Sequence, residues 1–181
     1  MSRKKLPPQF SRIKGSSMLL FKPTGDDIKE AYERSEKLQI QPNSFTNGVG
    51  RMPGFIGEVA FEQLYPEAQY VGEGCFTHDY ELGRRTIDVK SLKCTSTPRS
   101  DYKAAVNCKL DKKLKANTYF FTRVHSSLSH AWVLGWSPAS RIISNGKFNK
   151  KGETDPDNGF TYKAHCWNFP ISLLLRANSL K

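Results

Sequence analysis

Residues 79–90 read DYELGRRTIDVK, and their pattern is the most informative one for the fold of this chain. Apolar and polar residues alternate on both sides of a Gly-Arg-Arg sequence at 83–85. Such alternation predicts half-buried strands, and a glycine between two such runs is typical of a hairpin turn. We therefore expect two strands, over 71–82 and 86–93, joined by a tight turn.

The second strand of this hairpin carries two kinds of side chain. Strand side chains alternate between the faces of a sheet, so Ile87 and Val89 point to one face. Asp88 and Lys90 then point to the other. A turn that brings Asp79 across the hairpin gathers two carboxylates and one ammonium group. Two close carboxylates call for a cation, and a site of oxygen ligands beside a lysine suits Mg²⁺ and phosphodiester hydrolysis.

Two helices are expected before the hairpin. The first is capped by Thr24 and runs to about Lys37, with two aspartates in its first turn, where negative charge suits the helix dipole. A loop follows over 39–50, and the second helix starts near Pro53 and ends before Pro66. The expected apolar stripe of the first helix is Ile28, Ala31, Tyr32, Ser35 and Leu38, and that of the second is Phe55, Ile56, Val59, Ala60 and Leu64.

Two glutamates, Glu58 and Glu62, lie four residues apart on another face of the second helix. Like charges at this spacing slightly disfavour a helix. We expect Glu62 to lie on a solvated acidic edge.

The remainder of the chain predicts more strands and a closing helix. Two apolar runs at 119–124 and 131–136 predict strands. The basic stretch at 110–115 is expected to be a short turn or helix, and 169–177 a closing helix. The fold class is therefore α/β or α+β, with helices first and then a mixed β-sheet flanked by helices.

The length of the chain, 181 residues, is that of one domain. We expect a basic N-terminal arm over 1–20 and a single domain over 21–181. No apolar run is long enough for a bilayer span or a secretory signal, so we expect a cytoplasmic protein without membrane contact. The four cysteines are scattered without a CxxC pair, which argues against a disulfide framework and a structural zinc site.

The charge of the chain indicates a polyanionic partner. There are 28 Lys and Arg residues against 17 Asp and Glu, a net charge of +11, which favours nucleic acid. The segment 84–115 contains ten basic and three acidic residues, a local net charge of +7. The candidate contacts to a nucleic-acid backbone are Arg84, Arg85, Lys93, Arg99, Lys103, Lys112, Lys113 and Lys115.

On these residues the chain resembles the PD-(D/E)XK nuclease superfamily. In that family a first acidic residue lies on one strand, and the next strand carries Asp or Glu, any residue and then Lys. Asp79 matches the first acid, Asp88 the second and Lys90 the lysine. Glu58, in the sequence GEVAF, matches a glutamate on an upstream helix. The resemblance covers roughly residues 54–136 and implies a restriction-endonuclease-like core.

The resemblance implies a metal-dependent deoxyribonuclease, with RNA as an alternative substrate. Asp79, Asp88 and the carbonyl of Val89 would hold Mg²⁺, for which Mn²⁺ can substitute. Glu58 would be a direct or water-mediated ligand, and Lys90 would position the attacking water. Family members act as monomers or as dimers, so a homodimer is an option. The size is similar to that of small bacteriophage nucleases, which would place the protein in the host-cell cytoplasm.

One position departs from the family pattern. His78 stands where the family has proline before the first acid. Because Asp79 and Glu81 lie two residues apart on the same strand face, either could be the first metal ligand, and Asp79 is preferred.

Three other interpretations stay open. Asp88 and Lys90 could form an ordinary surface salt bridge. The protein could bind nucleic acid without cutting it, because the positive charge supports that function equally well. It could also be an interaction protein, such as an inhibitor, whose basic face binds an acidic protein.

Overall fold

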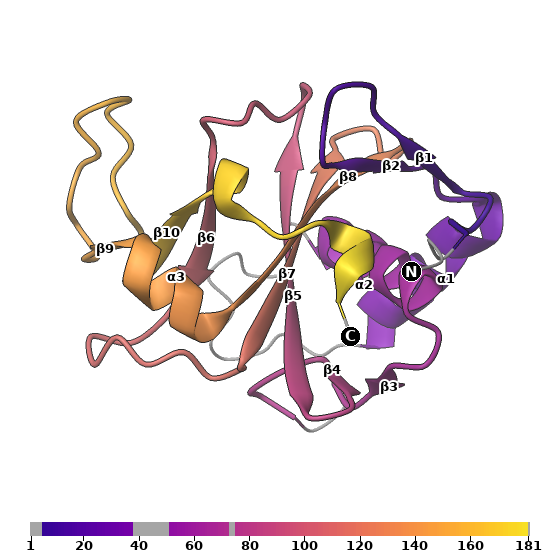
Figure 1. Cartoon of the computed structure of the whole chain (residues 1–181), viewed down its shortest axis with the longest axis horizontal. Coiled ribbons are helices and arrows are strands. Elements are labelled where there is room, and N and C mark those ends of the chain that lie inside the picture. The colour runs from indigo at the N-terminus through magenta and orange to yellow at the C-terminus, as the bar shows by residue number, and fades with distance from the viewer. Residues whose placement is uncertain (1–4, 38–50, 73–74, 181) are drawn as a thin grey trace.

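The computed structural model describes residues 5–37, 51–72 and 75–180. The loop expected over 39–50 lies outside these ranges. The described part contains two β-sheets and three α-helices, so the fold is mixed α+β, as predicted (Figure 1). Within these ranges no helix has both the length and the apolar character that crossing a bilayer requires.

Seven strands form the main sheet, in the spatial order β1-β2-β8-β7-β5-β4-β3. The central strands β5 and β7 pair in parallel, and the other neighbours pair antiparallel. A small antiparallel sheet has the order β6-β10-β9. The bounds in the main sheet are β1 (Phe10–Arg12), β2 (Leu19–Phe21), β8 (Ala131–Pro138), β7 (Thr118–His125), β5 (Arg85–Cys94), β4 (Tyr80–Leu82) and β3 (Gln69–Tyr70). Those in the small sheet are β6 (Lys103–Asn107), β10 (Cys166–Pro170) and β9 (Lys147–Asn149), and the helices are α1 (Gly25–Lys37), α2 (Arg51–Leu64) and α3 (Ala139–Asn145).

The predicted hairpin is present as β4 and β5. Leu82 is paired with Arg85, so a two-residue turn connects the strands. Gly83, the first residue of this turn, has a φ of 59°, a conformation that glycine adopts without steric cost. The strands expected at 119–124 and 131–136 are confirmed as β7 and β8.

Helix α1 begins as its sequence predicts. The Asp27 amide donates a hydrogen bond to Thr24 Oγ1 at 3.2 Å, and the Thr24 amide donates to Asp27 Oδ2 at 2.6 Å. These two bonds satisfy amides that have no partner within the helix. Ala31 and Ser35 of the expected stripe are buried, but Tyr32 is 55% exposed, so its place in the stripe was wrong. Leu38 lies outside the described residues.

Helix α2 packs its apolar face on the main sheet, and all five residues expected in that face are buried. Gly57 lies where the helix meets β5 and β7. A Cβ atom at this position would be 1.9 Å from Ser91 Oγ and 2.6 Å from Thr122 Oγ1. These two hydroxyls are hydrogen-bonded to each other at 2.7 Å, so neither moves away freely. Glycine therefore permits the close approach that sets the position of α2 over the sheet.

The small sheet covers the opposite face of the main sheet. Figure 1 shows α1 and α2 to one side of the central strands, and β6, β9, β10 and α3 to the other. A second apolar core lies between the two sheets; its fully or nearly buried members include Tyr119, Phe121, Trp132, Leu134, Val106 and Phe169. The molecule thus has two cores, one on each face of the main sheet.

Two predictions at the ends of the chain were wrong. Residues 1–20 do not form an arm where they are described, because β1 and β2 extend the main sheet and the rings of Phe10 and Phe21 pack at 4.9 Å in the core. The segment 169–177 is not a helix. It contains the end of β10, a 3₁₀ turn over Ile171–Leu173, and Leu175, whose extended backbone exchanges hydrogen bonds with that of Trp136.

The first hairpin strand was also predicted too long. In place of one strand over 71–82, the chain forms β3 over 69–70 and β4 over 80–82. The backbones of Val71 and Asp79 still hydrogen-bond at the ends of these short strands, but the Val89 amide donates to the side chain of Asp79, where a longer β4 would have supplied a backbone carbonyl.

We expect Gly57→Ala to lower the free energy of unfolding by about 2 kcal/mol, because the added methyl group overpacks the contact with β5 and β7. Gly54→Ala is the matched control on the same helix, where a Cβ atom meets nothing within 4 Å. It should raise the free energy of unfolding by about 0.5–1 kcal/mol through helix propensity. Urea denaturation of the two variants measures both values, and equal stabilities would contradict this view of the α2 contact.

Candidate active site

The hairpin brings Asp79 and Asp88 opposite each other. Tyr80 and Ile87 form the last residue pair between β4 and β5, and just beyond it the carboxylate of Asp79 interacts with that of Asp88. The Asp79 amide donates to the Ile87 carbonyl at 2.9 Å, and Asp79 Oδ2 accepts a hydrogen bond from the Val89 amide at 2.8 Å. The Asp79 carboxylate thus accepts the hydrogen bond that a backbone carbonyl of a longer β4 would accept. The strands β4 and β5 diverge at this point.

Lys90 lies on the same strand face as Asp88. Its Nζ atom is 2.6 Å from Asp88 Oδ1, and the Asp88 side chain is only 15% exposed. Burial by itself lowers the pKa of Lys90, but the negative charges of Asp88, Asp79 and Glu58 outweigh it, and the pKa is raised. The lysine is therefore a fixed positive charge beside the carboxylates.

Glu58 of α2 is the third acidic residue of the site. Burial, and next the charge of Asp79, raise the pKa of Glu58 to about 8. The pKa of Asp79 is raised for similar reasons, first by burial and then by the nearby charge of Asp88. The site thus carries more negative charge than Lys90 neutralises, and a cation bound there would relieve this excess.

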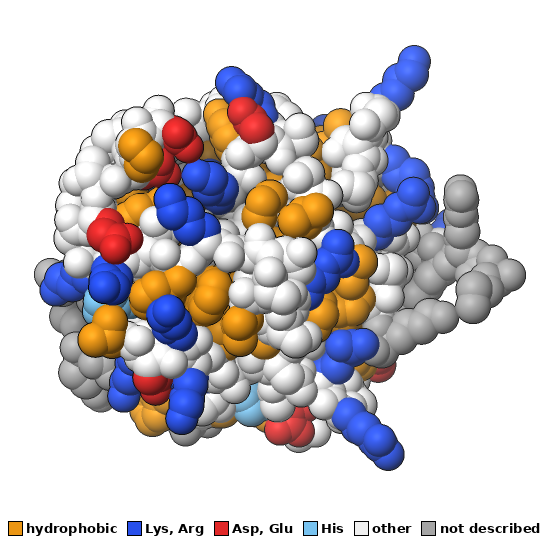
Figure 2. All heavy atoms as spheres, turned by 60° about the vertical axis from the view of Figure 1, so that its left-hand side comes forward, with side chains coloured by type: hydrophobic (Ala, Val, Ile, Leu, Met, Phe, Trp, Pro, Cys, Tyr) orange, Lys and Arg blue, Asp and Glu red, His pale blue; other side chains and the backbone are white. Residues whose placement is uncertain are grey.

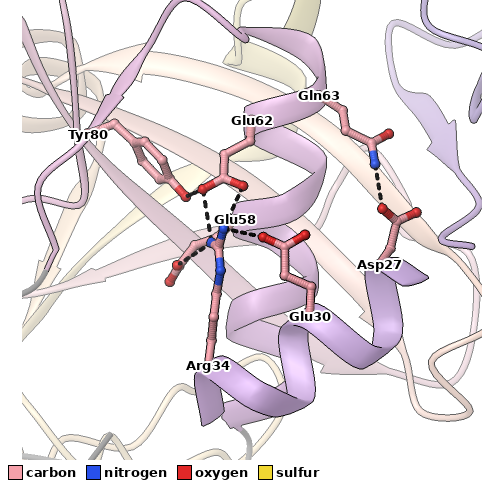
Figure 3. A network of polar contacts seen from close by, with 7 residues as sticks. All are labelled: Asp27, Glu30, Arg34, Glu58, Glu62, Gln63 and Tyr80. Atoms are coloured by element: carbon pink, nitrogen blue, oxygen red, sulfur yellow. Dashed lines mark hydrogen bonds and ion pairs between the residues drawn. The ribbon is translucent and has the colours of Figure 1, made fainter. Parts of the chain in front are cut away.

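A partly buried network links Glu58 to α1 (Figure 3). The guanidinium of Arg34 donates two hydrogen bonds to Glu62, both at 2.9 Å, and one to Glu30 at 2.5 Å. It also lies 3.9 Å from Glu58 Oε2. The Tyr80 hydroxyl donates to Glu62 Oε1 at 2.7 Å, which ties the network to β4.

This network corrects the expectation for Glu62. The residue was expected at a solvated acidic edge, but its carboxylate joins α1, α2 and β4. The sequence did contain a signal, because Glu58 and Glu62 are like charges at a spacing that disfavours a helix unless a cation lies between them. Arg34, which comes from another helix, is that cation, and sequence reasoning missed it.

The acidic groups fit Mg²⁺ by their donor chemistry. Two carboxylates suffice for this ion, which retains waters and takes substrate oxygens as further ligands. The backbone carbonyl of Val89 faces the same edge of β5 as its amide, toward Asp79. Among the described residues, no group of three or more His, Cys, Asp or Glu side chains is placed to hold a metal ion. The direct side-chain ligands would therefore be Asp79 and Asp88, and Glu58 would act through water.

Glu81 lies away from this pair. It is paired with Thr86 and Gln69 in the sheet, its side chain is 52% exposed, and its Oε1 atom lies 3.4 Å from Nε2 of His78. Of the two acids that the sequence left as alternatives, the structure places Asp79 next to Asp88.

The basic residues proposed from the sequence do not form one surface. Lys115 donates to the carbonyl of Phe76 at 3.0 Å and so lies beside the loop that leads to Asp79. Arg99 forms an ion pair with Asp101 at 2.5 Å, which reduces its availability to a phosphate.

Other candidates are dispersed in the same way. Lys103 lies 3.6 Å from carboxylate oxygens of both Asp155 and Asp157, and Lys112 lies over the ring of Phe148 at 4.9 Å. Figure 2 shows Lys and Arg side chains spread over the face turned forward there, with hydrophobic and acidic side chains between them. Arg84 and Arg85 lie at the hairpin turn, while Lys93 is exposed near the far end of β5.

Comparison with known proteins identifies no relative. No family model matches the chain, and a search of curated proteins finds no similar sequence.

Removing Arg34 tests the network. Arg34→Met should lower the free energy of unfolding by about 2–3 kcal/mol, because it leaves the partly buried Glu62 without its charged partner. Lys29→Met on the same helix is the matched control, since Lys29 forms only an exposed ion pair with Glu33 at 4.0 Å. That substitution should change stability by less than about 0.5 kcal/mol. Chemical denaturation compares the two, and similar losses would contradict a special role for Arg34.

The raised pKa of Glu58 predicts a loss of stability as pH rises. This carboxyl has an ordinary pKa of 4.5 and a folded-state pKa of about 8. Between these values the folded protein holds the proton more tightly than the unfolded chain does, so ionisation disfavours folding. Without divalent metal, the free energy of unfolding should therefore fall between about pH 5 and pH 8, by up to about 1.4 kcal/mol per pH unit for this group.

Glu58→Gln removes this group, so the slope of stability against pH should become smaller and the variant should exceed the wild type in stability above about pH 8. Glu33→Gln, which removes a carboxylate whose side chain is 57% exposed, serves as the control and should retain the wild-type slope. A wild-type slope in Glu58→Gln would show that the pH dependence arises elsewhere.

Proposed function

We propose that the protein is a Mg²⁺-dependent nuclease that hydrolyses phosphodiester bonds in DNA, built on a restriction-endonuclease-like core of the PD-(D/E)XK type. One observation carries the proposal. Where β4 and β5 diverge, Asp79 and Asp88 face each other across the hairpin, with the ammonium of Lys90 at 2.6 Å from Asp88. Two acids that can hold a metal ion, beside a lysine that can stabilise developing negative charge, suit metal-assisted phosphodiester hydrolysis.

The metal would be held by Asp79, Asp88 and the carbonyl of Val89, with Glu58 as a water-mediated ligand. When bound, Mg²⁺ lowers the pKa of a water molecule and stabilises negative charge on the phosphoryl oxygens. Mn²⁺ would substitute, because its preference for oxygen ligands is similar.

The protein's own groups would carry the remaining steps. The ammonium of Lys90 donates hydrogen bonds to the attacking water and orients it toward the phosphorus. Its positive charge also stabilises the charge that develops on the phosphate oxygens. The Asp79 carboxylate is held by the Val89 amide, so it does not have to be reoriented when substrate binds. The Arg34 network fixes the helix that carries Glu58.

The substrate would be bound through its phosphates. Lys115 lies beside the loop that leads to Asp79, and the exposed Arg84 lies at the end of the same hairpin. Contacts of these two residues with phosphates would make binding depend on salt and not on base sequence.

A second candidate function is nucleic-acid binding without hydrolysis. The observation that favours it is that no group of three metal-ligating side chains occurs within the described ranges. In this case Lys90 and Asp88 form an ion pair only, and the basic residues act alone. The two functions differ in a single property, which is cleavage that depends on a divalent metal.

Asp88→Asn tests the proposed function. We expect the wild type to cut plasmid or single-stranded DNA with Mg²⁺ or Mn²⁺, and to lose this activity in EDTA. Asp88→Asn and Lys90→Ala should each lower the cleavage rate by more than about 100-fold, because the first removes a ligand of the metal and the second the group that orients the attacking water. DNA binding measured in EDTA should persist in both. Asp101→Asn, which removes an exposed carboxylate within an ion pair, should retain the wild-type rate.

The choice between the two upstream acids is tested in the same assay. Asp79→Asn should abolish cleavage, whereas Glu81→Gln should not. Cleavage that persists in Asp88→Asn, or a wild type that binds DNA and never cuts it with either metal, would overturn the nuclease proposal. Thermal unfolding of each variant verifies that it is folded.

A further inference from the structure

A large cavity lies at the closed end of the hairpin. Its volume is about 1240 Å³, and it is bounded by the β4–β5 turn, the C-terminal end of α2, residues 5–7 and the C-terminal segment 176–180. Small-molecule sites typically measure about 300–1,000 Å³. A cavity of this size therefore suits an extended ligand better than a single small molecule.

The lining of this cavity is strongly basic. Five positively charged side chains face it and only one acidic residue, Glu67, does so; the five are Lys5, Arg12, Arg84, Arg85 and Arg176. Basic residues predominate over the whole chain, but the carboxylates that pair with them elsewhere are nearly absent from this lining. The cavity thus favours a ligand with several negative charges.

Three of these arginines have no charged partner among the described residues. Within residues 5–37, 51–72 and 75–180, no hydrogen bond or ion pair involves the guanidinium of Arg12, Arg84 or Arg176. Arg85 is held in position, since its guanidinium lies over the ring of Trp136 at 4.9 Å from the ring centre. Unpaired guanidinium groups present forked donors that match phosphate oxygens.

The cavity is separate from the acidic site. Side chains alternate along β5, so Arg85 shares a strand face with Ile87 and Val89, while Asp88 points to the other face. Asp88 lies three positions after Arg85, which corresponds to about 10 Å along the strand. A ligand in the cavity therefore does not touch the carboxylates, but a chain that continues around the hairpin turn past Arg84 can reach them.

We infer that this cavity binds a segment of single-stranded nucleic acid, a second contact that lies apart from the site of hydrolysis. The guanidinium groups bind the phosphates, and accessible apolar lining residues, among them Leu6, Pro7 and Pro66, contact the bases. A single strand fits, because its backbone bends into a cavity, whereas a duplex takes protein elements into its own grooves. The inference rests on the proposed function for the nature of the ligand, and its test does not depend on cleavage.

The test measures binding of a fluorescein-labelled single strand of mixed sequence, by fluorescence anisotropy in EDTA at several salt concentrations. We expect the double variant Arg12→Gln/Arg176→Gln to weaken binding by about tenfold and to lower the slope of log K against log [salt] by about 1.4, the value for two lost phosphate contacts. Both side chains belong to exposed residues, so the fold should be retained, which thermal unfolding verifies.

Lys147→Gln/Lys150→Gln is the matched control, because it removes two positive charges from exposed positions at β9. This variant should bind the strand as the wild type does. Wild-type affinity in the Arg12/Arg176 variant, or an equal loss in both double variants, would overturn the cavity assignment and leave the nuclease proposal intact. An equal loss for a duplex of the same sequence would overturn the single-strand assignment. Metal-dependent cleavage, assayed separately, reports on the proposed function alone.

Discussion

The hydrogen bond from the Val89 amide to the Asp79 carboxylate is the contact on which the candidate active site depends. A strand edge offers its amides to a neighbouring strand, and here a side chain takes that place. As a result the regular pairing of β4 with β5 begins only at Tyr80, and the carboxylate of Asp79 lies beside that of Asp88. Both Asp79 and the backbone of Val89 are thereby fixed before any ligand arrives, which removes the need to order them during binding.

The negative charge of these carboxylates is partly neutralised by Lys90 on β5 and by Arg34 on α1. The charges of Asp79 and Asp88 contribute to the raised pKa of Glu58, and that of Asp88 to the raised pKa of Asp79, while Lys90 supplies one positive charge and Arg34 approaches from α1. The arginine is bound mainly to Glu62 and leaves Glu58 only partly neutralised, at a distance of 3.9 Å. An arrangement that stabilised the fold alone would pair each acid fully. The negative charge that is left would attract a divalent cation, and a bound cation would in turn attract a phosphate.

Patterns of short range were predicted well from the sequence. The cap at Thr24, the apolar face of α2, the hairpin turn at Gly83 and the strands β7 and β8 all depend on residues close in the chain. The wrong predictions concern segments whose conformation depends on contacts with residues far away in the chain. β1 and β2 form because β2 pairs with β8 and β1 pairs with β2. Leu175 is extended because its backbone pairs with that of Trp136. Arg34 could not be assigned to Glu62, since the two lie 28 residues apart.

The sequence by itself determined the presence of an α+β fold, a hairpin with Asp88 and Lys90 on one face, and an excess of positive charge. These properties follow from residue period and composition, which need no knowledge of distant contacts. Three features became visible only in the tertiary structure. Asp79, and not Glu81, lies beside Asp88, and Arg34 contacts the glutamates of α2. A basic cavity lies at the closed end of the hairpin. Each of these depends on how separate elements pack, because a side chain finds its partner in space and not along the chain.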